Sequence, residues 1–535
     1  MRRTSVVFWS SLAVVLPVVL WGALAPGSLG SAAEATRAFV VDRFGWFYLL
    51  TATGLLVAVI VLAASRYGRV RLGGDDERPQ YSTGAWFAML FSAGMGIGLV
   101  FWGVAEPVSH YLVPPTATPE TTEAAREALR YSFFHWGLHP WAIYSVLALA
   151  LAYARYRRGW KATISGALRP VLGDRADGPV GIAVDTIAVV ATVFGVATSL
   201  GLGAAQVNGG LAALSDGIAV DAGVQLAIIA VVTVLFLVST LSGLDRGIKW
   251  LSTVNVVLAI GLLLFVMFTG PTGRLVGAYT TTLGSYLTEL PTMSLQTGPF
   301  DPERSEWING WTIFYWAWWI SWSPFVATFI ARISRGRTIR EFVIGVLGVP
   351  TLLSGLWFAV FGGAGVLAQQ GGAGLGDQGT ESQLFALLDT LPGGVVAGIG
   401  AMVLIVTFFV TSADSATFVL GSLSTKEGRD PARPVSMVWG LLIAATAAVL
   451  LVSGGLEGVQ TASIVAAAPF AVVLLLTLVA LVRGLREEHV PARPAPRGPL
   501  AQPAAPAVAD RVPDGHGDGH GEAVPSGATR DGAVR

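Results

Sequence analysis

The most informative stretch of the chain, residues 311–325, reads WTIFYWAWWISWSPF. It is apolar enough to form a membrane helix, but four Trp fall within the seven residues from Trp316 to Trp322. This segment rises about 9 Å along a helix, so its Trp cannot all belong to one interfacial belt. Aromatic rings hold quaternary ammonium ions, which donate no hydrogen bonds, and each ring face contributes about 0.5–2 kcal/mol. The stretch therefore predicts a helix that binds a methylated ammonium group.

The composition around this stretch is that of a membrane protein. Apolar residues make up 53% of the 535 residues, charged residues make up 13%, and the mean hydropathy is +0.63. A typical globular chain has about a quarter charged residues. The formal net charge is zero, so no nucleic-acid partner is indicated. The chain has no Cys, which excludes disulfides, thiolate catalysis and Cys-bound metals.

Apolar runs of about 20 residues, the length that crosses a bilayer, occur twelve times. They begin near Val6, Phe47, Ala85, Phe133, Gly181, Val224, Leu251, Trp311, Phe342, Gly393, Val435 and Gln460. Basic segments follow each even-numbered run, at residues 66–71, 155–161, 246–249, 332–340, 426–433 and 483–486. Because basic loops stay in the cytoplasm, we expect a multi-pass protein of the cell (inner or plasma) membrane with both termini cytoplasmic.

The two ends of the chain need separate interpretation. Arg2 and Arg3 precede an apolar run, Val6 to Leu24, which is longer than the apolar part of a signal peptide, so we expect an uncleaved helix. From about Val490 the chain is rich in Pro, Ala and Gly and is predicted to be disordered. The HGDGH stretch at residues 516–520 is interpreted as part of this polar tail rather than as a metal site.

Two further apolar runs carry helix-breaking residues. Residues 92–98 read SAGMGIG, and each Gly costs about 1 kcal/mol in a helix relative to Ala. This run predicts either an unwound helix, as in transporters that present backbone groups to ligands, or close packing of helices. Residues 135–144 read HWGLHPWAIY, where Trp141 and Tyr144 share a helix face beside Pro140. An interfacial aromatic belt is the ordinary alternative for this segment.

Hydroxyl groups cluster within two other runs. Residues 408–417 read FFVTSADSAT and residues 197–203 read ATSLGLG. Ser and Thr oxygens suit a hard monovalent cation, although they also join helices by hydrogen bonds. Asp414 is either functional or a buried structural carboxylate. If runs three to seven and eight to twelve are two repeats, a broken helix opens each repeat and a hydroxyl-rich helix is third in each, as in inverted-repeat transporters.

These motifs together resemble the betaine/choline/carnitine transporter family. The resemblance rests on residues 94–107 (GMGIGLVFWGVAEP), 135–141, 314–325 and 331–340 (ARISRGRTIR). It implies an all-α membrane protein with twelve transmembrane helices, a LeuT-like core of two inverted five-helix repeats preceded by two peripheral helices, and commonly a homotrimer. The implied segments are peripheral helices over 1–80, a first repeat over 81–270, a periplasmic or extracellular connection over 271–307, a second repeat over 308–486 and a cytoplasmic tail over 487–535.

The resemblance also carries binding residues over by motif. The implied substrate residues are Trp136, Trp141, Tyr144, Trp318, Trp319 and Trp322, together with Met95 and Gly96 of the glycine run. One implied sodium site consists of Met95, Phe408, Thr411 and Ser412. A second consists of Thr198 or Ser199 with Phe325.

Together, the motifs and the resemblance imply a secondary active transporter that imports a quaternary ammonium compatible solute, such as glycine betaine, for osmoprotection. Sodium symport is expected, because Gly98 leaves the glycine run without a titratable carboxylate and no basic residue lies between Gly181 and Leu211. A proton-coupled choline importer or a substrate exchanger of the same family is the alternative.

An enzyme is not expected: His135 and His139 lie one helical turn apart, but no second ligand pair or nucleophile–base pair accompanies them in the sequence. No cofactor is implied beyond the coupling ion, and the expected partners are the lipid bilayer and the solute.

Overall fold

The computed structural model describes residues 5–94, 96–215, 217–242, 245–426 and 431–488. Every regular element in these ranges is helical, apart from one antiparallel bridge between Arg71 and Thr338. The predicted all-α class is therefore confirmed. Met95 and the tail beyond Glu488 lie outside these ranges.

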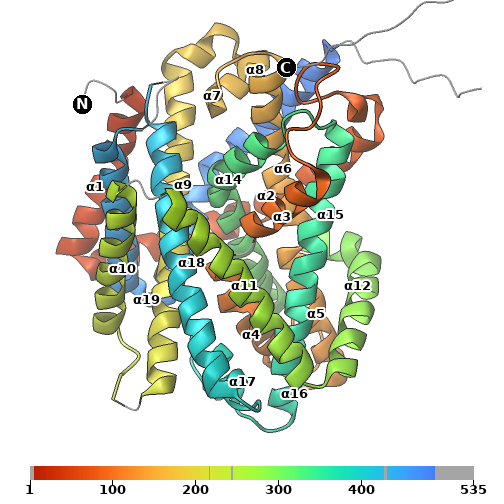
Figure 1. Cartoon of the computed structure of the whole chain (residues 1–535), viewed down its shortest axis with the longest axis vertical. Coiled ribbons are helices and arrows are strands. Elements are labelled where there is room, and N and C mark those ends of the chain that lie inside the picture. Colours follow the sequence, from red (N-terminus) through yellow and green to blue (C-terminus); the bar gives the residue numbers. More distant parts are fainter. Residues whose placement is uncertain (1–4, 95, 216, 243–244, 427–430, 489–535) are drawn as a thin grey trace, which may run out of the picture. The chain divides into compact units, whose positions relative to one another are not determined.

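The helices follow one another along the chain as Figure 1 shows. The first part contains α1 (Val6–Leu24), α2 (Pro26–Ala64), α3 (Thr83–Gly94), α4 (Ile97–Leu112), α5 (Thr122–Trp136), α6 (Leu138–Ala152), α7 (Ile164–Ala167), α8 (Arg169–Leu172), α9 (Pro179–Leu214), α10 (Ala222–Ser242) and α11 (Asp245–Thr269). The second part contains α12 (Thr272–Ser294), α13 (Pro302–Ile308), α14 (Phe314–Ile333), α15 (Ile339–Trp357), α16 (Gly363–Gln370), α17 (Gln383–Asp389), α18 (Gly394–Leu423) and α19 (Arg433–Arg486). Turns of π-helix lie at Tyr153–Arg157, Asn309–Ile313 and Phe358–Gly362, and 3-10 turns lie at Arg66–Arg69, Gly173–Asp177 and Leu375–Asp377.

Nine helical stretches in the described ranges are long and apolar enough to cross a membrane. The third predicted run is absent from that count because it is split into α3 and α4, and the eighth, in α14, because Trp, Tyr and Ser lower its hydropathy. The last two runs are joined in α19, which departs from helical geometry at Gly454 and Gly455. The helices fit a chain that crosses a membrane several times, and the total of twelve stays a prediction.

Helix α2 begins much earlier than the sequence predicted. The apolar run starts near Phe47, but the helix starts at Pro26, a residue that suits the first turn of a helix. Packing rather than apolar composition holds this early part: a Cβ on Gly30 would clash with the carbonyl oxygen of Ser453 in α19, so the two backbones are in close contact. The contact with Ser453 is distant in the sequence, so Pro26 is the local signal of where the helix begins.

Helix α14, which carries the Trp-rich stretch, lies in the interior of the bundle. It packs against α6, α9 and α19, and Figure 1 shows it near the centre of the view. Tyr315, Trp316 and Trp318 are buried. Because these large rings face neighbouring helices rather than lipid, the Trp-rich stretch is part of the interior and not an interfacial belt.

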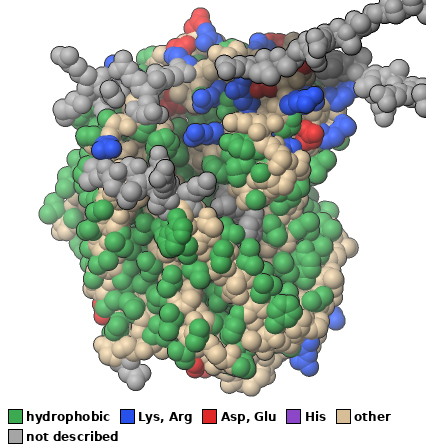
Figure 2. All heavy atoms as spheres, in the orientation of Figure 1, with side chains coloured by type: hydrophobic (Ala, Val, Ile, Leu, Met, Phe, Trp, Pro, Cys, Tyr) green, Lys and Arg blue, Asp and Glu red, His purple; other side chains and the backbone are tan. Residues whose placement is uncertain are grey.

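The basic residues gather mainly at one end of the molecule. Figure 2 shows Lys and Arg side chains at the end where α7 and α8 lie, while apolar side chains cover the middle. Two side chains of the basic loop 332–340 contact other segments: Arg335 pairs with Glu77, and the guanidinium of Arg337 lies 4.1 Å from the centre of the Trp86 ring. This distribution is the pattern expected of a cytoplasmic face.

We predict that loop 332–340 faces the cytoplasm. The chain has no Cys, so a single Cys placed at the exposed Arg332 reports its side of the membrane without background labelling. In intact cells, R332C should resist a membrane-impermeant maleimide and react only after permeabilisation. E303C, at the exposed start of α13, is the matched control and should react from outside. The opposite labelling of the two variants would contradict this orientation.

Candidate functional site

A small cavity lies between α5, α6, α14 and α15. Its lining residues are Trp136, Pro140, Trp141, Tyr144, Trp319, Trp322 and Ser354. Five of these seven are aromatic residues that the resemblance implies for the substrate. The free space between them holds about one water molecule. A larger group therefore enters only if the rings move apart.

The rings around this cavity stand nearly at right angles to one another. Trp136 and Trp319 have ring centroids 4.8 Å apart with planes at 79°, and Tyr144 lies 6.2 Å from Trp319 at 86°. Trp141 and Tyr144 are 5.6 Å apart at 84°. Rings that meet at right angles form the walls of a box rather than a stack. Such walls offer ring faces to a cation that cannot donate hydrogen bonds.

A helix break brings Trp136 and Trp141 to the same cavity. Helix α5 ends at Trp136 and α6 begins at Leu138, and Gly137 between them has φ −96° and ψ −129°. A Cβ on Gly137 would lie 2.8 Å from the hydroxyl of Tyr286 in α12. The backbone N–H of Leu138 donates a hydrogen bond to this hydroxyl at 3.0 Å. Tyr286 thus partners a backbone group beside the break.

Hydrogen bonds fix two of the indoles at one edge. The Nε1–H of Trp319 donates to the carbonyl oxygen of His135 at 2.9 Å, and that of Trp136 donates to Oε2 of Glu106 at 2.7 Å. By contrast, the Tyr144 hydroxyl and the Trp322 indole N–H are buried without a hydrogen-bond partner among the described residues. These two groups are available to a polar atom of a ligand.

The glycine run breaks its helix, as the sequence allowed. Helix α3 ends at Gly94 and α4 begins at Ile97, with Gly96 extended between them at φ −154° and ψ −178°. Met95, which the sequence assigned to the substrate and to one sodium site, lies outside the described residues. The break is therefore established, while the part that Met95 plays in it stays a prediction.

The same run also packs closely against the rings. A Cβ on Gly98 would clash with the Trp318 ring and lie 3.1 Å from the Trp136 ring. A Cβ on Gly96 would lie 3.8 Å from the Trp322 ring, which is ordinary contact. Trp318 itself lies behind the cavity: it stacks on Trp319 with centroids 4.9 Å apart and planes at 15°. The predicted site residue Trp318 therefore supports a wall without lining this space.

Three residues of the first predicted sodium site, Phe408, Thr411 and Ser412, lie on α18. Phe408 is buried, whereas Thr411 and Ser412 are half-buried. The Thr411 hydroxyl bonds to the carbonyl of Thr407 at 2.9 Å and accepts a hydrogen bond from the amide of Asn255 at 3.1 Å. These oxygens share one stretch of helix, and their relation to Met95 stays a prediction.

The residues of the second predicted sodium site are engaged differently. The Thr198 hydroxyl lies 2.7 Å from the Val459 carbonyl and 2.7 Å from the Ser463 hydroxyl, both in α19. Ser199 bonds to its own helix through the Gly195 carbonyl at 3.4 Å. Phe325 packs on Trp322, with ring centroids 5.5 Å apart. The Thr198 hydroxyl is thus bonded to α19 rather than to the helix that carries Phe325. Ser463 is a partner that sequence reasoning missed.

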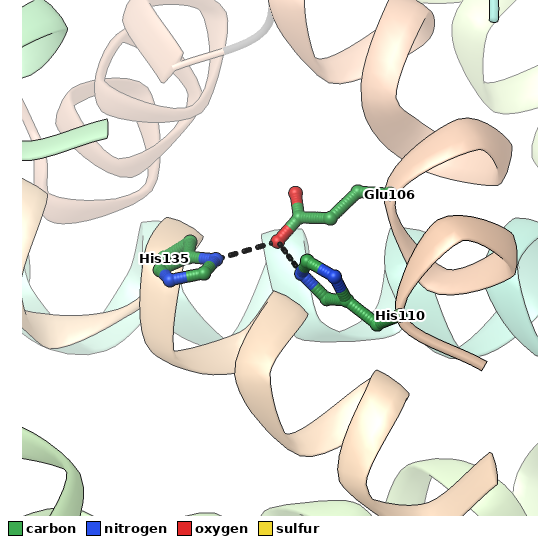
Figure 3. A group of neighbouring side chains, drawn as sticks. All are labelled: Glu106, His110 and His135. Atoms are coloured by element: carbon green, nitrogen blue, oxygen red, sulfur yellow. Dashed lines mark hydrogen bonds and ion pairs between the residues drawn. The ribbon is translucent and has the colours of Figure 1, made fainter. Parts of the chain in front are cut away.

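Sequence reasoning also missed a buried polar cluster beside the cavity. Figure 3 shows Glu106 of α4 between His110 of α4 and His135 of α5. All three are buried, and one ligand atom from each lies within 4.8 Å of the others. Among the residues that the structure describes, these three form the group that is close enough to hold a metal ion. The available signal was a carboxylate inside an apolar run, which is by default a functional candidate.

A family model and similar sequences point to one family. The family model for betaine/carnitine/choline transporters matches residues 6–490. The glycine betaine transporter OpuD of Bacillus subtilis is 51% identical over 91% of this chain and 96% of its own length. A probable glycine betaine transporter of Desulfitobacterium hafniense is 41% identical over 91% and 99%, and an ectoine/hydroxyectoine transporter of Virgibacillus pantothenticus is 43% identical over 90% and 96%. A solved sodium-coupled sialic acid symporter aligns with 81% of this chain and 87% of its own at a TM-score of 0.44 and 14% identity.

We expect the ring faces to contribute directly to binding of a trimethylammonium ligand. Trp319→Leu should weaken binding by about 2- to 30-fold, because one cation–π face of about 0.5–2 kcal/mol is lost. Trp141→Leu should act in the same direction. Isothermal titration calorimetry on purified protein measures both, and the exposed Trp250, changed to Leu, is the control. Unchanged affinity in both cage variants would remove the cage from the binding site.

Gly98 provides a second, steric test of the site. Gly98→Ala places a methyl group against the Trp318 ring, so Trp318 and the stacked Trp319 must shift, and we expect ligand affinity to fall. Gly84→Ala is the matched control, because a Cβ at Gly84 meets nothing within 4 Å. Affinity measured by quenching of Trp fluorescence should separate the two variants. Equal affinities would show that the close approach of Gly98 to Trp318 is irrelevant to binding.

Proposed function

Because the chain belongs to the betaine/carnitine/choline family of transporters, we propose that it imports a compact quaternary ammonium solute such as glycine betaine. The chain is a multi-pass membrane transporter and not an enzyme. The observation that carries the proposed substrate is the box of perpendicular rings around the cavity, formed by Trp136, Trp141, Tyr144 and Trp319. A trimethylammonium group has the charge and the apolar surface that such a box binds.

The polar groups of the cavity suit the other end of a betaine. Its carboxylate needs hydrogen-bond donors, and the Tyr144 hydroxyl and Trp322 indole N–H are buried without partners among the described residues. A zwitterion therefore uses both kinds of lining group, whereas choline, which has no carboxylate, uses the rings chiefly. The relatives named as glycine betaine transporters support this preference. An ectoine-type zwitterion is the competing substrate, because one relative is named for it.

We further propose that sodium drives the import. Thr411 and Ser412 of α18 supply neutral oxygens, and the break between α3 and α4 can add backbone carbonyls, as suits a monovalent cation in a discontinuous-helix transporter. No described side chain between residues 181 and 211 is basic, so no built-in cation replaces the ion there. A proton-coupled importer or an exchanger is the alternative within the family.

The arrangement proposed for the whole protein follows from the family. It comprises twelve transmembrane helices, two inverted five-helix repeats over 81–270 and 308–486, cytoplasmic termini and a homotrimer. The split of α3 from α4 and the π turn at Asn309–Ile313, which precedes α14, support the repeats, because each repeat then opens with an irregular helix.

Sodium coupling predicts a defined change when the hydroxyls of α18 are removed. In proteoliposomes, uptake of labelled glycine betaine should rise with external sodium, and the double variant T411A/S412A should require far more sodium for half-maximal uptake. The matched control is T407A/S422A, whose hydroxyls bond to carbonyls of their own helix.

Other outcomes of this assay separate the alternatives. Uptake that ignores sodium and follows an imposed proton gradient would replace sodium by protons. Uptake that requires internal substrate alone would identify an exchanger. Absence of glycine betaine uptake under every gradient, with uptake of ectoine instead, would overturn the proposed substrate.

A further inference from the structure

Glu106 accepts four hydrogen bonds at a position with no access to solvent. Its Oε2 accepts from Trp136 Nε1–H at 2.7 Å and from the Tyr315 hydroxyl at 2.6 Å. Its Oε1 lies 2.7 Å from His135 Nδ1 and 3.3 Å from His110 Nε2. Figure 3 draws these two contacts as dashed lines. The residue is 0% exposed. The carboxylate is thus held by side chains of α4, α5 and α14.

The hydrogen bonds are consistent with an ionised carboxylate and a neutral His135 ring. Trp136 can only donate, so Oε2 is an acceptor. If His135 donates from Nδ1, its Nε2 accepts from the Thr312 hydroxyl at 2.9 Å, and this assignment follows from the network. Within the described residues, the ion-pair partners of Glu106 are the two His and no Lys or Arg. Within the described residues, no permanently positive side chain therefore neutralises this carboxylate.

The distances favour this network over a bound metal. Two atoms that each lie about 2.1 Å from one metal ion are about 3 Å or more apart at the usual angles. Oε1 of Glu106 and Nδ1 of His135 are 2.7 Å apart, the length of a charge-assisted hydrogen bond. A metal at this position would also have to displace the protons that now satisfy the carboxylate.

The cluster is connected to the aromatic box by three contacts. Trp136 is one wall of the box and bonds directly to Glu106. Trp319, another wall, donates to the backbone carbonyl of His135 at 2.9 Å. The Tyr315 ring lies nearly parallel to Trp319, with centroids 6.2 Å apart and planes at 21°. The position of two walls therefore depends on groups that Glu106 holds.

We propose that Glu106 is the positioning and specificity-determining residue of the box: it holds the Trp136 ring in place and supplies the negative charge behind it that favours a cationic head group. A carboxylate that accepts the indole N–H increases the electron density of the ring, which strengthens a cation–π contact on its face. The charge also attracts the ammonium group across the ring, where the dielectric is low. This inference rests on the proposed function, because it assumes that the box receives a quaternary ammonium group.

The test compares a charged ligand with its neutral-headed counterpart. Glycine betaine and 3,3-dimethylbutanoate have the same shape, but the second has a carbon atom in place of the ammonium nitrogen. Dissociation constants for both are measured by calorimetry on the purified full-length protein in sodium chloride, for wild type, E106Q and E106D. The control is E127Q, which changes a buried carboxylate of α5 whose hydrogen bonds go to Thr116 and Ala117 and not to the box.

We expect E106Q to bind glycine betaine about tenfold more weakly or worse, as loss of a nearby charge at low dielectric implies. Its affinity for 3,3-dimethylbutanoate should not fall, because that ligand has no positive charge for Glu106 to attract. E106D keeps the charge and should keep the preference for glycine betaine. E127Q should match wild type for both ligands.

Several results would overturn the inference. One is a glycine betaine affinity of E106Q within twofold of that of the wild type. Another is an equal loss of affinity of E106Q for both ligands, because disorder of the aromatic box alone would weaken both. Stoichiometric zinc in the purified wild type that is absent from E106Q would make the cluster a metal site instead. If E106Q does not fold, as judged by gel filtration and melting temperature, a folded E106D without preference for glycine betaine decides against the inference. Failure of the proposed function is distinct, because wild type itself would then not bind glycine betaine.

Discussion

In the apolar part of a bilayer, every backbone N–H and C=O group must find a partner within the protein. This constraint accounts for the helical architecture, and it makes each helix break a place where side chains must supply partners. At Gly137, the hydroxyl of Tyr286 accepts the N–H of Leu138, and the indole of Trp319 donates to the carbonyl of His135. A wall of the aromatic box is therefore also a partner for the backbone of the broken helix. A continuous helix through Gly137 would need the His135 carbonyl that Trp319 now occupies, so the helix break and the aromatic box are coupled through this contact.

The same reasoning applies to charge. A buried carboxylate costs several kcal/mol unless its oxygens are satisfied, and Glu106 meets this requirement with donors from Trp136, Tyr315 and two His. The hydrogen bonds that make the charge tolerable also fix the orientation of the rings that receive them. The polar cluster and the box are consequently one structural unit. A change in either is expected to alter the other, as interaction energies within one network generally do.

The sequence predicted those features that local patterns encode. The apolar runs predicted an all-α chain, and the Gly at alternate positions in residues 92–98 predicted a broken or closely packed helix. The Trp spacing in α14 predicted that these Trp do not all lie in one interfacial belt, and Trp316 and Trp318 are buried. Features that depend on distant partners escaped it. Gly30 in the early part of α2 packs closely against Ser453 of α19, and the Thr198 hydroxyl bonds to Ser463 rather than to the helix of Phe325.

Glu106 shows the same limit most clearly. It lies inside a motif that was recognised, yet its importance comes from Trp136, which is 30 positions away, and from Tyr315, which is 209 positions away. Neither spacing has a local signature.

The geometry of Glu106 also bears on which ion is coupled to transport. A proton-coupled site needs a carboxylate that gains and loses a proton during the cycle, and Glu106 is a carboxylate beside the box. A proton on Oε1 would face His135 Nδ1 and His110 Nε2, and an imidazole nitrogen can accept it. A proton on Oε2 would compete with the donors of Trp136 and Tyr315. Trp136 cannot reverse its role, because an indole N–H has no acceptor lone pair, so a proton on Oε2 would break a contact that holds a wall. The contacts to the box therefore require that Oε2 stay unprotonated. In the sodium symport proposed above, the cation would bind among the hydroxyls of α18 and would leave this network undisturbed while the solute moves.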